Sequence, residues 1–232
     1  MYADKSIGAV ILAAGKSSRA DGRVNKVYRE LAGSAVLNHS LTCFVESGII
    51  DQLVVVFNGN DAELLRERVV EGFNCEVPLE AVPGGERRQD SSWAGLNKVD
   101  TNYVFVHDGA RPNFSFRLLK DLLDKAISCG ASYPGLKPVD TVRRLEGGFS
   151  GETVDRDKLV RVQTPQCFEY DLLYDAIEKS IEEGNYYTDD AGAVMNVAKV
   201  KPAVVPGERG NIKLTTNEDF AVVEKFLRGD EG

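Results

Sequence analysis

Residues 8–19 read Gly8-Ala-Val-Ile-Leu-Ala-Ala-Gly-Lys-Ser-Ser-Arg19, and this stretch decides the fold. Its first half is a short apolar run that enters a loop of small residues, as a strand does at the ligand-binding edge of a parallel sheet. Exposed backbone N–H groups in such a loop can bind phosphate. A Walker phosphate loop is excluded because Val10 stands where it needs glycine, and a dehydrogenase GxGxxG fingerprint is excluded because only Gly15 is present.

Strand-like and helical segments alternate along the rest of the chain. We expect further strands at 52–57, 77–82, 103–106, 131–136 and 199–205, and helices at 36–45, 61–70 (capped by Asp61), 90–99, 118–128, 170–183, 189–197 and 217–228. This alternation predicts a Rossmann-like α/β fold, a mostly parallel sheet with helices on both faces. We find no linker or internal repeat and therefore expect a single domain over residues 1–232.

The rhythm changes after Pro138. Residues 140–145 alternate polar and apolar side chains, residues 146–148 form a glycine turn, and residues 152–162 are extended in character. This pattern predicts a β-hairpin arm within residues 138–162. Because a two-stranded hairpin is marginally stable alone, we expect the arm to pack against a partner subunit.

Composition excludes several classes of protein. The 232 residues carry 28 Lys and Arg against 36 Asp and Glu, a formal charge of −8, which disfavours broad binding to nucleic acid or anionic membrane. No apolar run approaches a membrane span, and the start of the chain does not resemble a signal peptide. The cysteines, which are widely spaced, favour buried reduced thiols and a cytoplasmic location.

Charged residues that suit phosphate chemistry follow three of these segments. Arg19 and Lys26 lie in the basic loop after the first strand, and Asp108 ends a strand where it could hold a divalent cation. Arg111 could clamp a phosphate with its planar guanidinium, and Lys213, which we expect on a strand, precedes a Thr-Thr helix start. Taken singly, these features also fit a solvated loop, a capped turn and an exposed lysine.

Ordered motifs narrow the alternatives. Eight motifs occur in this order: AAGxxxR, Lys26-Val-Tyr, VHDGARP (106–112), PVDTV (138–142), VDR (154–156), QTPQCF (163–168), TDDAG (188–192) and NIKLTT (211–216). Through these motifs the chain resembles, from Gly8 to Leu227, the 2-C-methyl-D-erythritol 4-phosphate cytidylyltransferase family of sugar-phosphate nucleotidyltransferases.

The resemblance implies a reaction and a set of site residues. CTP and 2-C-methyl-D-erythritol 4-phosphate, a phosphorylated polyol, would give 4-diphosphocytidyl-2-C-methyl-D-erythritol and pyrophosphate with Mg²⁺ or another divalent cation, in the non-mevalonate isoprenoid pathway. The carried-over roles are catalytic cations at Arg19, Lys26 and Lys213; nucleotide contacts at Ala13, Ala14, Gly15, Gly85 and Ser91; a metal ligand at Asp108; and acceptor-site residues at Gly109, Arg111, Thr141, Arg156, Thr164 and Thr188. Thr141 and Arg156 would reach across a homodimer through the arm.

Two other functions remain open at this point. A ribitol-5-phosphate cytidylyltransferase of teichoic acid synthesis shares the loop, the arm and QTPQ, and its acceptor is also a phosphorylated polyol. A non-catalytic nucleotide-binding protein with a decayed site is the third reading. Asn25 stands where the family has proline, and this departure predicts a looser loop before Lys26.

Overall fold

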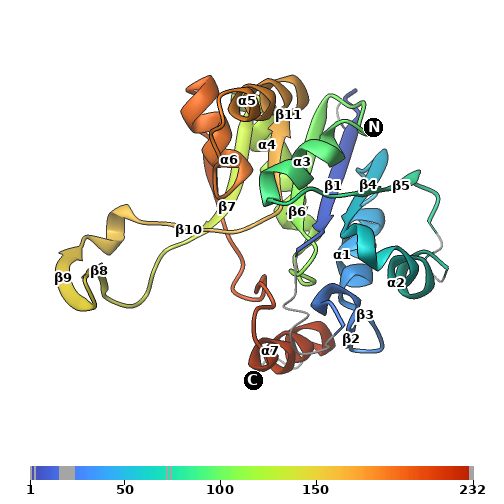
Figure 1. Cartoon of the computed structure of the whole chain (residues 1–232), viewed down its shortest axis with the longest axis horizontal. Coiled ribbons are helices and arrows are strands. Elements are labelled where there is room, and N and C mark those ends of the chain that lie inside the picture. Colours follow the sequence, from blue (N-terminus) through green and yellow to red (C-terminus); the bar gives the residue numbers. More distant parts are fainter. Residues whose placement is uncertain (1, 3, 16–23, 72, 74, 230–232) are drawn as a thin grey trace.

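The centre of the molecule is a mostly parallel sheet of eight strands. The computed structural model describes residues 2, 4–15, 24–71, 73 and 75–229. Strand order is β10-β7-β11-β6-β1-β4-β5, with β12 paired to β7 (Figure 1). The strands are β1 (Ile7–Ala13), β4 (Gln52–Phe57), β5 (Leu79–Pro83), β6 (Tyr103–Asp108), β7 (Ala131–Leu136), β10 (Arg161–Val162), β11 (Gln166–Glu169) and β12 (Ala203–Pro206). The pairs β1–β4, β1–β6, β4–β5 and β12–β7 are parallel, which confirms the expected fold class.

Helices cover both faces of the sheet because successive strand residues point to opposite sides. Ile7, Ala9 and Ile11 belong to the core beneath α1 (Val36–Glu46) and α4 (Phe116–Cys129). Val10 lies in the second core, against α3 (Arg88–Leu96), α5 (Tyr170–Glu182) and α6 (Asp190–Ala193). All four strand residues are fully buried, so the continuous apolar run of β1 serves two cores at once.

A third, smaller hydrophobic core lies against α7 (Asn217–Arg228), apart from the two cores on the faces of the sheet. α7 packs near the small hairpin of β2 (Glu30–Leu31) and β3 (Ser34–Ala35), at the lower end of the view in Figure 1. α2 (Ala62–Leu65) continues as a wider π-helical turn over Arg66–Val70. The expected cap by Asp61 is wrong, because its side chain makes no capping bond and its carboxylate instead accepts a hydrogen bond from Asn25.

Three other local expectations are corrected. β12 starts at Ala203 rather than at 199, because Lys199 has a positive φ of 58° and ends the preceding helical turn. Lys213 lies in an irregular segment and not on a strand. The antiparallel strand β11, which was not expected, lies between β6 and β7.

The arm leaves the sheet after β7 and extends away from the rest of the molecule (Figure 1). β8 (Val142–Glu146) and β9 (Phe149–Val154) form an antiparallel pair of their own, and no other described strand pairs with them. We expected residues 152–162 to be extended, but the return segment is extended only in part. It forms a 3-10 turn at Arg156–Lys158 and then rejoins the main sheet as β10.

Two further expectations concern buried reduced cysteines and the lack of a membrane span. All four cysteines are free, but only Cys167 is buried, while Cys43 and Cys75 are partly exposed and Cys129 is exposed. The prediction of four buried thiols is therefore wrong for three of them. Among the described residues, no helix has both the length and the apolar character needed to cross a lipid bilayer.

Candidate active site

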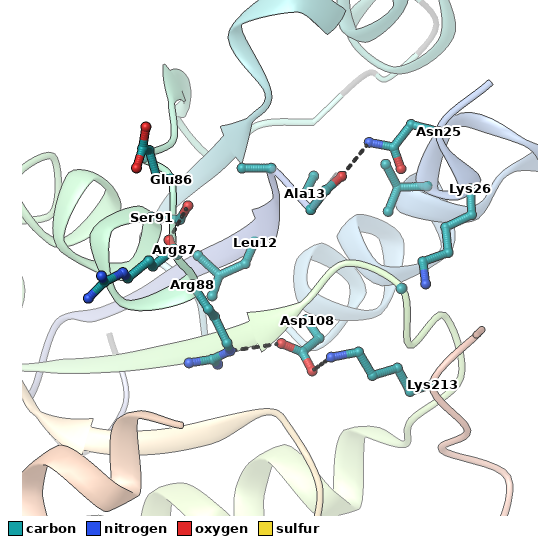
Figure 2. A pocket seen from close by; sticks show the side chains of 15 residues that line it. Leu12, Ala13, Asn25, Lys26, Glu86, Arg87, Arg88, Ser91, Asp108 and Lys213 are labelled. Carbon is teal, nitrogen blue, oxygen red and sulfur yellow. Dashed lines mark hydrogen bonds and ion pairs between the residues drawn. The ribbon is translucent and has the colours of Figure 1, made fainter. Parts of the chain in front are cut away.

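A cavity of about 290 Å³ opens where β1 and β6 end and α3 begins (Figure 2). The sequence-predicted residues among its lining are Ala13, Ala14, Gly15, Lys26, Gly85, Ser91, Asp108 and Lys213. Residues from both ends of the chain thus meet at the carboxyl edge of the parallel strands, where α/β sheets bind ligands. The cavity volume is near the lower end of the range for small-molecule sites.

The backbone after β1 is accessible to a ligand. A Cβ placed on Gly15 would meet no atom within 4 Å, so the main chain there borders open space. Gly85 is constrained in a different way, because a Cβ on it would lie 2.3 Å from Cβ of Asp90. Glycine at 85 therefore lets the chain pass close to the first turn of α3, next to the buried Ser91.

Asn25 holds the two ends of the basic loop together. Its Nδ2 donates to the carbonyl oxygen of Gly15 at 3.1 Å and to the carboxylate of Asp61 at 3.1 Å. The side chain is only 7% exposed. Two hydrogen bonds therefore fix the Asn25 side chain, while residues 16–23 of the loop that we expect to be looser lie outside the described residues.

Asp108 is the centre of a charge cluster on the cavity wall. Its Oδ2 accepts from Nζ of Lys213 at 2.8 Å, its Oδ1 accepts from Nε of Arg88 at 3.2 Å, and Nε of Arg111 lies 3.7 Å from Oδ2. Burial alone would raise the pKa of Asp108, but the charges of Arg88 and Lys213 outweigh it and hold the pKa well below its usual range. Asp108 is therefore ionised and orients cations toward the cavity.

A second cavity of about 320 Å³ adjoins the first, and Arg88, Asp108 and Lys213 line both. The predicted acceptor residues Arg111, Thr164 and Thr188 also line it. Nη1 of Arg111 donates to the carbonyl oxygen of Asn211 at 2.9 Å, which fixes its guanidinium against the segment that carries Lys213. Burial lowers the pKa of Arg111 despite the adjacent Asp108.

Thr164 supports Asp108 from behind. Its Oγ1 accepts a hydrogen bond from the backbone N–H of Asp108 at 3.0 Å and lies 3.1 Å from Nδ1 of His107. Nε2 of His107 lies 3.0 Å from the carbonyl oxygen of Arg111, which can only accept. Nε2 therefore carries the proton, and Nδ1 accepts from the Thr164 hydroxyl.

Three of the remaining predicted residues, all of them described, do not line these two cavities. Gly109 is buried and lines neither cavity. It packs near Leu37, since a Cβ placed on Gly109 would lie 3.0 Å from Cδ1 of that residue. Thr141 and Arg156 lie at the arm, where Nη1 of Arg156 donates to the carbonyl oxygen of Val139 at 2.5 Å. Within one chain they are not brought to the site. Arg19 lies outside the described residues.

Arg88 is the main residue that sequence reasoning missed. It bonds Asp108 with Nε and the buried Asp190 with Nη1, the latter at 2.7 Å. Burial would lower the pKa of Arg88, but Asp190 and Asp108 raise it, so the guanidinium stays charged. The sequence feature that could have indicated it is the pair Arg87-Arg88 within Gly85–Ser91. The sequence alone does not show which of the two arginines points outward and which points into the site.

The donor set bears on the predicted metal. No three His, Cys, Asp or Glu side chains gather into a metal-binding group among the described residues. Mg²⁺ is commonly held by one or two carboxylates with substrate phosphates supplying further oxygens. Asp108, whose carboxylate lies on the wall shared by both cavities, fits that pattern, and does not fit a metal held by protein alone.

This fold and this site together define an α/β nucleotidyltransferase, with backbone amides and fixed cations around adjoining substrate cavities. The model of the family "IspD: 2-C-methyl-D-erythritol 4-phosphate cytidylyltransferase" matches residues 7–229. The chain therefore belongs to that family.

Individual relatives agree with this assignment. The 2-C-methyl-D-erythritol 4-phosphate cytidylyltransferase of Caldanaerobacter subterraneus subsp. tengcongensis is 39% identical over 227 residues, covering 96% of this chain and 99% of that protein. The protein of the same name from Clostridium novyi is 36% identical over 94% of this chain and 95% of its own length. The crystal structure of 4-diphosphocytidyl-2C-methyl-D-erythritol synthase from Anaerococcus prevotii superposes with a TM-score of 0.84 at 28% identity, covering 97% of this chain and 99% of that one.

Proposed function

We propose that this chain transfers the cytidylyl group of CTP to 2-C-methyl-D-erythritol 4-phosphate, releasing pyrophosphate and serving isoprenoid precursor synthesis. Family membership supports the reaction type, and the relatives carry that enzyme's name. The observation that carries the proposal is the shared wall of the two cavities. Arg88, Asp108 and Lys213 form the wall shared by a cavity of about 290 Å³ and one of about 320 Å³, as a two-substrate transfer requires.

The residues suit direct transfer without a covalent enzyme intermediate. An oxygen of the acceptor phosphate attacks the α-phosphorus of CTP, and the bond to pyrophosphate breaks in line. The attacking phosphate is already ionised at neutral pH, so no general base is needed. Negative charge grows on the α-phosphoryl oxygens, where Lys26 and Lys213 would neutralise it and Arg19 would hold the triphosphate.

In this scheme the Lys213 ammonium group has two possible partners, the carboxylate of Asp108 and the α-phosphate of CTP. In this structure its ammonium group donates a hydrogen bond to Asp108 at 2.8 Å. Asp108 would hold a divalent cation together with the triphosphate, and such a cation offsets phosphate charge when bound. Lys213 would contact the α-phosphate of bound CTP. Arg111 and Thr188 would contact the acceptor from the second cavity.

The arm supports a homodimer. Leu145 and Phe149 are 80% and 79% exposed on its hairpin, and Val139 at its base is 69% exposed. A two-stranded hairpin with such apolar side chains gains stability when another surface covers it. A second copy of this chain would cover the arm and receive Thr141 and Arg156 at its acceptor site. We place the enzyme in the cytoplasm, consistent with free cysteines.

The first experiment measures pyrophosphate release from CTP and Mg²⁺ with methylerythritol phosphate and ribitol 5-phosphate side by side. We expect release with methylerythritol phosphate and little with ribitol phosphate. Release with neither acceptor contradicts the enzyme reading. Preference for ribitol phosphate assigns the chain to the teichoic acid reaction instead.

The second experiment tests the two cations. Lys26→Ala and Lys213→Ala should each lower kcat by about 10²- to 10³-fold, as loss of one transition-state donor does. KM for the acceptor should change little, because the charge acts on the α-phosphoryl group. Lys120→Ala is the matched control, since Lys120 pairs with Asp124 on α4 away from both cavities. An unchanged kcat with only a raised KM contradicts the assigned roles.

A further inference from the structure

Lys26 and Lys213 lie on separate segments that are far apart in the sequence, yet they border one cavity (Figure 2). Lys26 begins a 3-10 turn that ends at Arg29, and Arg29 N–H donates to the carbonyl oxygen of Lys26 at 3.2 Å. Lys213 lies just ahead of Thr216, the N-cap of α7. A fixed separation between the two lysine-bearing segments is favoured by a direct connection between the 26–29 turn and α7.

Arg29 makes that connection. Its Nη1 donates to Oδ1 of Asn217, the first residue of α7, at 2.9 Å. Its guanidinium carbon lies 3.9 Å from the centre of the Phe220 ring, one turn further along the same helix. A guanidinium over an aromatic face is attracted by the ring and holds a defined orientation.

A small apolar core reinforces the same junction. One buried cluster contains Leu31, Leu214, Val36 of α1 and Val223 of α7. Leu31 follows Arg29 by two residues, and Leu214 is next to Lys213. Phe220 packs on this cluster. Both lysine-bearing segments are thus anchored within a few residues of their cations on one helix.

The charges at this junction also reach the lysine. Asp219 of α7 accepts hydrogen bonds from the backbone N–H groups of Thr215 and Thr216 at 2.7 Å. Burial and the charge of Lys213 lower the pKa of Lys26, and Asp219 and Asp108 oppose that shift. The Lys26 ammonium group therefore lies in the field of the α7 N-terminal turn as well as that of Asp108.

We propose that α7 acts as a brace that fixes Lys26 relative to Lys213, and that Arg29 is a positioning residue for the transfer reaction. Arg29 lines neither cavity, so its effect passes through Lys26. The inference rests on the proposed function, because it assumes that Lys26 acts on the triphosphate. It adds a determinant that substrate contacts alone do not reveal.

A double-mutant cycle tests this proposal. The variants are Arg29→Ala, Lys26→Ala and the double variant, with Phe220→Leu to remove the ring face while keeping apolar volume. We expect Arg29→Ala to lower kcat about 10- to 100-fold with unchanged acceptor KM, as a small misplacement of a catalytic group does. In the Lys26→Ala background the same change should have almost no further effect. Arg29→Lys should recover part of the loss, because an ammonium group can still reach Asn217 and the ring.

The controls separate the possible failures. Arg228→Ala alters an exposed pair with Glu224 at the other end of α7 and should leave kcat unchanged. Thermal unfolding of each variant shows whether the chain is folded at the assay temperature. Equal losses from Arg29→Ala with and without Lys26 overturn the brace and indicate a general structural role. If Lys26→Ala itself keeps full kcat, the proposed role of Lys26 fails instead.

Discussion

His107 lies directly behind the carboxylate that organises the site. Its ring packs 4.6 Å from Phe114 and 5.6 Å from Phe44, centre to centre, and both ring nitrogens have hydrogen-bonding partners. Burial lowers the pKa of His107 from 6.5 to about 3. The imidazole is thus neutral at working pH and serves as a fixed support for Thr164, with no part as a base.

This depressed pKa predicts a pH dependence of stability. Between pH 6.5 and 3 the unfolded chain binds a proton at His107 that the folded chain does not, so the free energy of unfolding falls as pH decreases. The loss is about 1.4 kcal/mol per pH unit over that range. His107→Gln should flatten the slope measured by urea unfolding at pH 7, 6 and 5.

The contribution of Asp108 does not interfere with that measurement. Its folded pKa is also lowered, so its stabilisation is lost only below the ordinary value of 3.8. His39→Gln is the matched control and should keep the slope, since His107 remains. An identical slope in wild type and His107→Gln contradicts the prediction.

At the scale of elements, α3 lies against the sheet at a glycine. A Cβ on Gly95 would lie 2.3 Å from Cγ1 of Val10 on β1 and 2.8 Å from Cγ2 of Val56 on β4. The helix therefore approaches these strands as closely as backbone allows. Gly85, Arg88 and Ser91, which lie at the start of α3 or just before it, line the first cavity, so the helix held by this contact also carries part of the cavity wall.

Gly95→Ala should accordingly destabilise the protein although alanine favours helices. The gain in helix propensity is about 1 kcal/mol, and overpacking of a tight core costs about 1–3 kcal/mol. Adding Val10→Ala makes room for the new methyl group, so the double variant should be more stable than the sum of the single effects. Urea unfolding measures both. A stabilised Gly95→Ala protein contradicts the close packing.

At the scale of the whole molecule, the arm extends away from the central sheet (Figure 1), and we propose that it acts on another subunit. Neither Thr141 nor Arg156 lines either of the two adjoining cavities. The net charge of −8 is likewise a property of the whole molecule and does not describe the site. Cationic side chains are concentrated at the two adjoining cavities, although the molecule as a whole is acidic. A local cationic site is therefore compatible with an acidic average.

Mixed dimers test whether the arm completes the site of a partner. Arg156→Ala and Lys26→Ala chains, each weakly active alone, should recover activity when mixed, since each heterodimer has one site with both residues intact. Pyrophosphate release measures the recovery. The control replaces the Lys26→Ala chain with a double Lys26→Ala, Arg156→Ala chain, which should restore nothing. No recovery with heterodimers demonstrated by differently tagged chains indicates a site built within one chain.

The amino-acid sequence by itself determined the alternation of strands and helices and the reaction class. Continuous apolar runs such as Gln52–Phe57 and ordered motifs around Asp108 and Lys213 are local signals, and each could be read without its neighbours. The expected side-chain cap at Asp61 is wrong because its carboxylate bonds the distant Asn25, and the strand expected from 199 starts at Ala203 because Lys199 has a positive φ.

Only the tertiary structure decided which residues meet. Arg88 gained its place between Asp108 and Asp190, and Arg29 its place on α7, through contacts between segments widely separated along the chain. Gly109 turned out to pack on Leu37 and not on a cavity. The physical reason is that periodicity and motif spacing report local conformation, whereas distances between cations across a site arise from packing of the whole molecule.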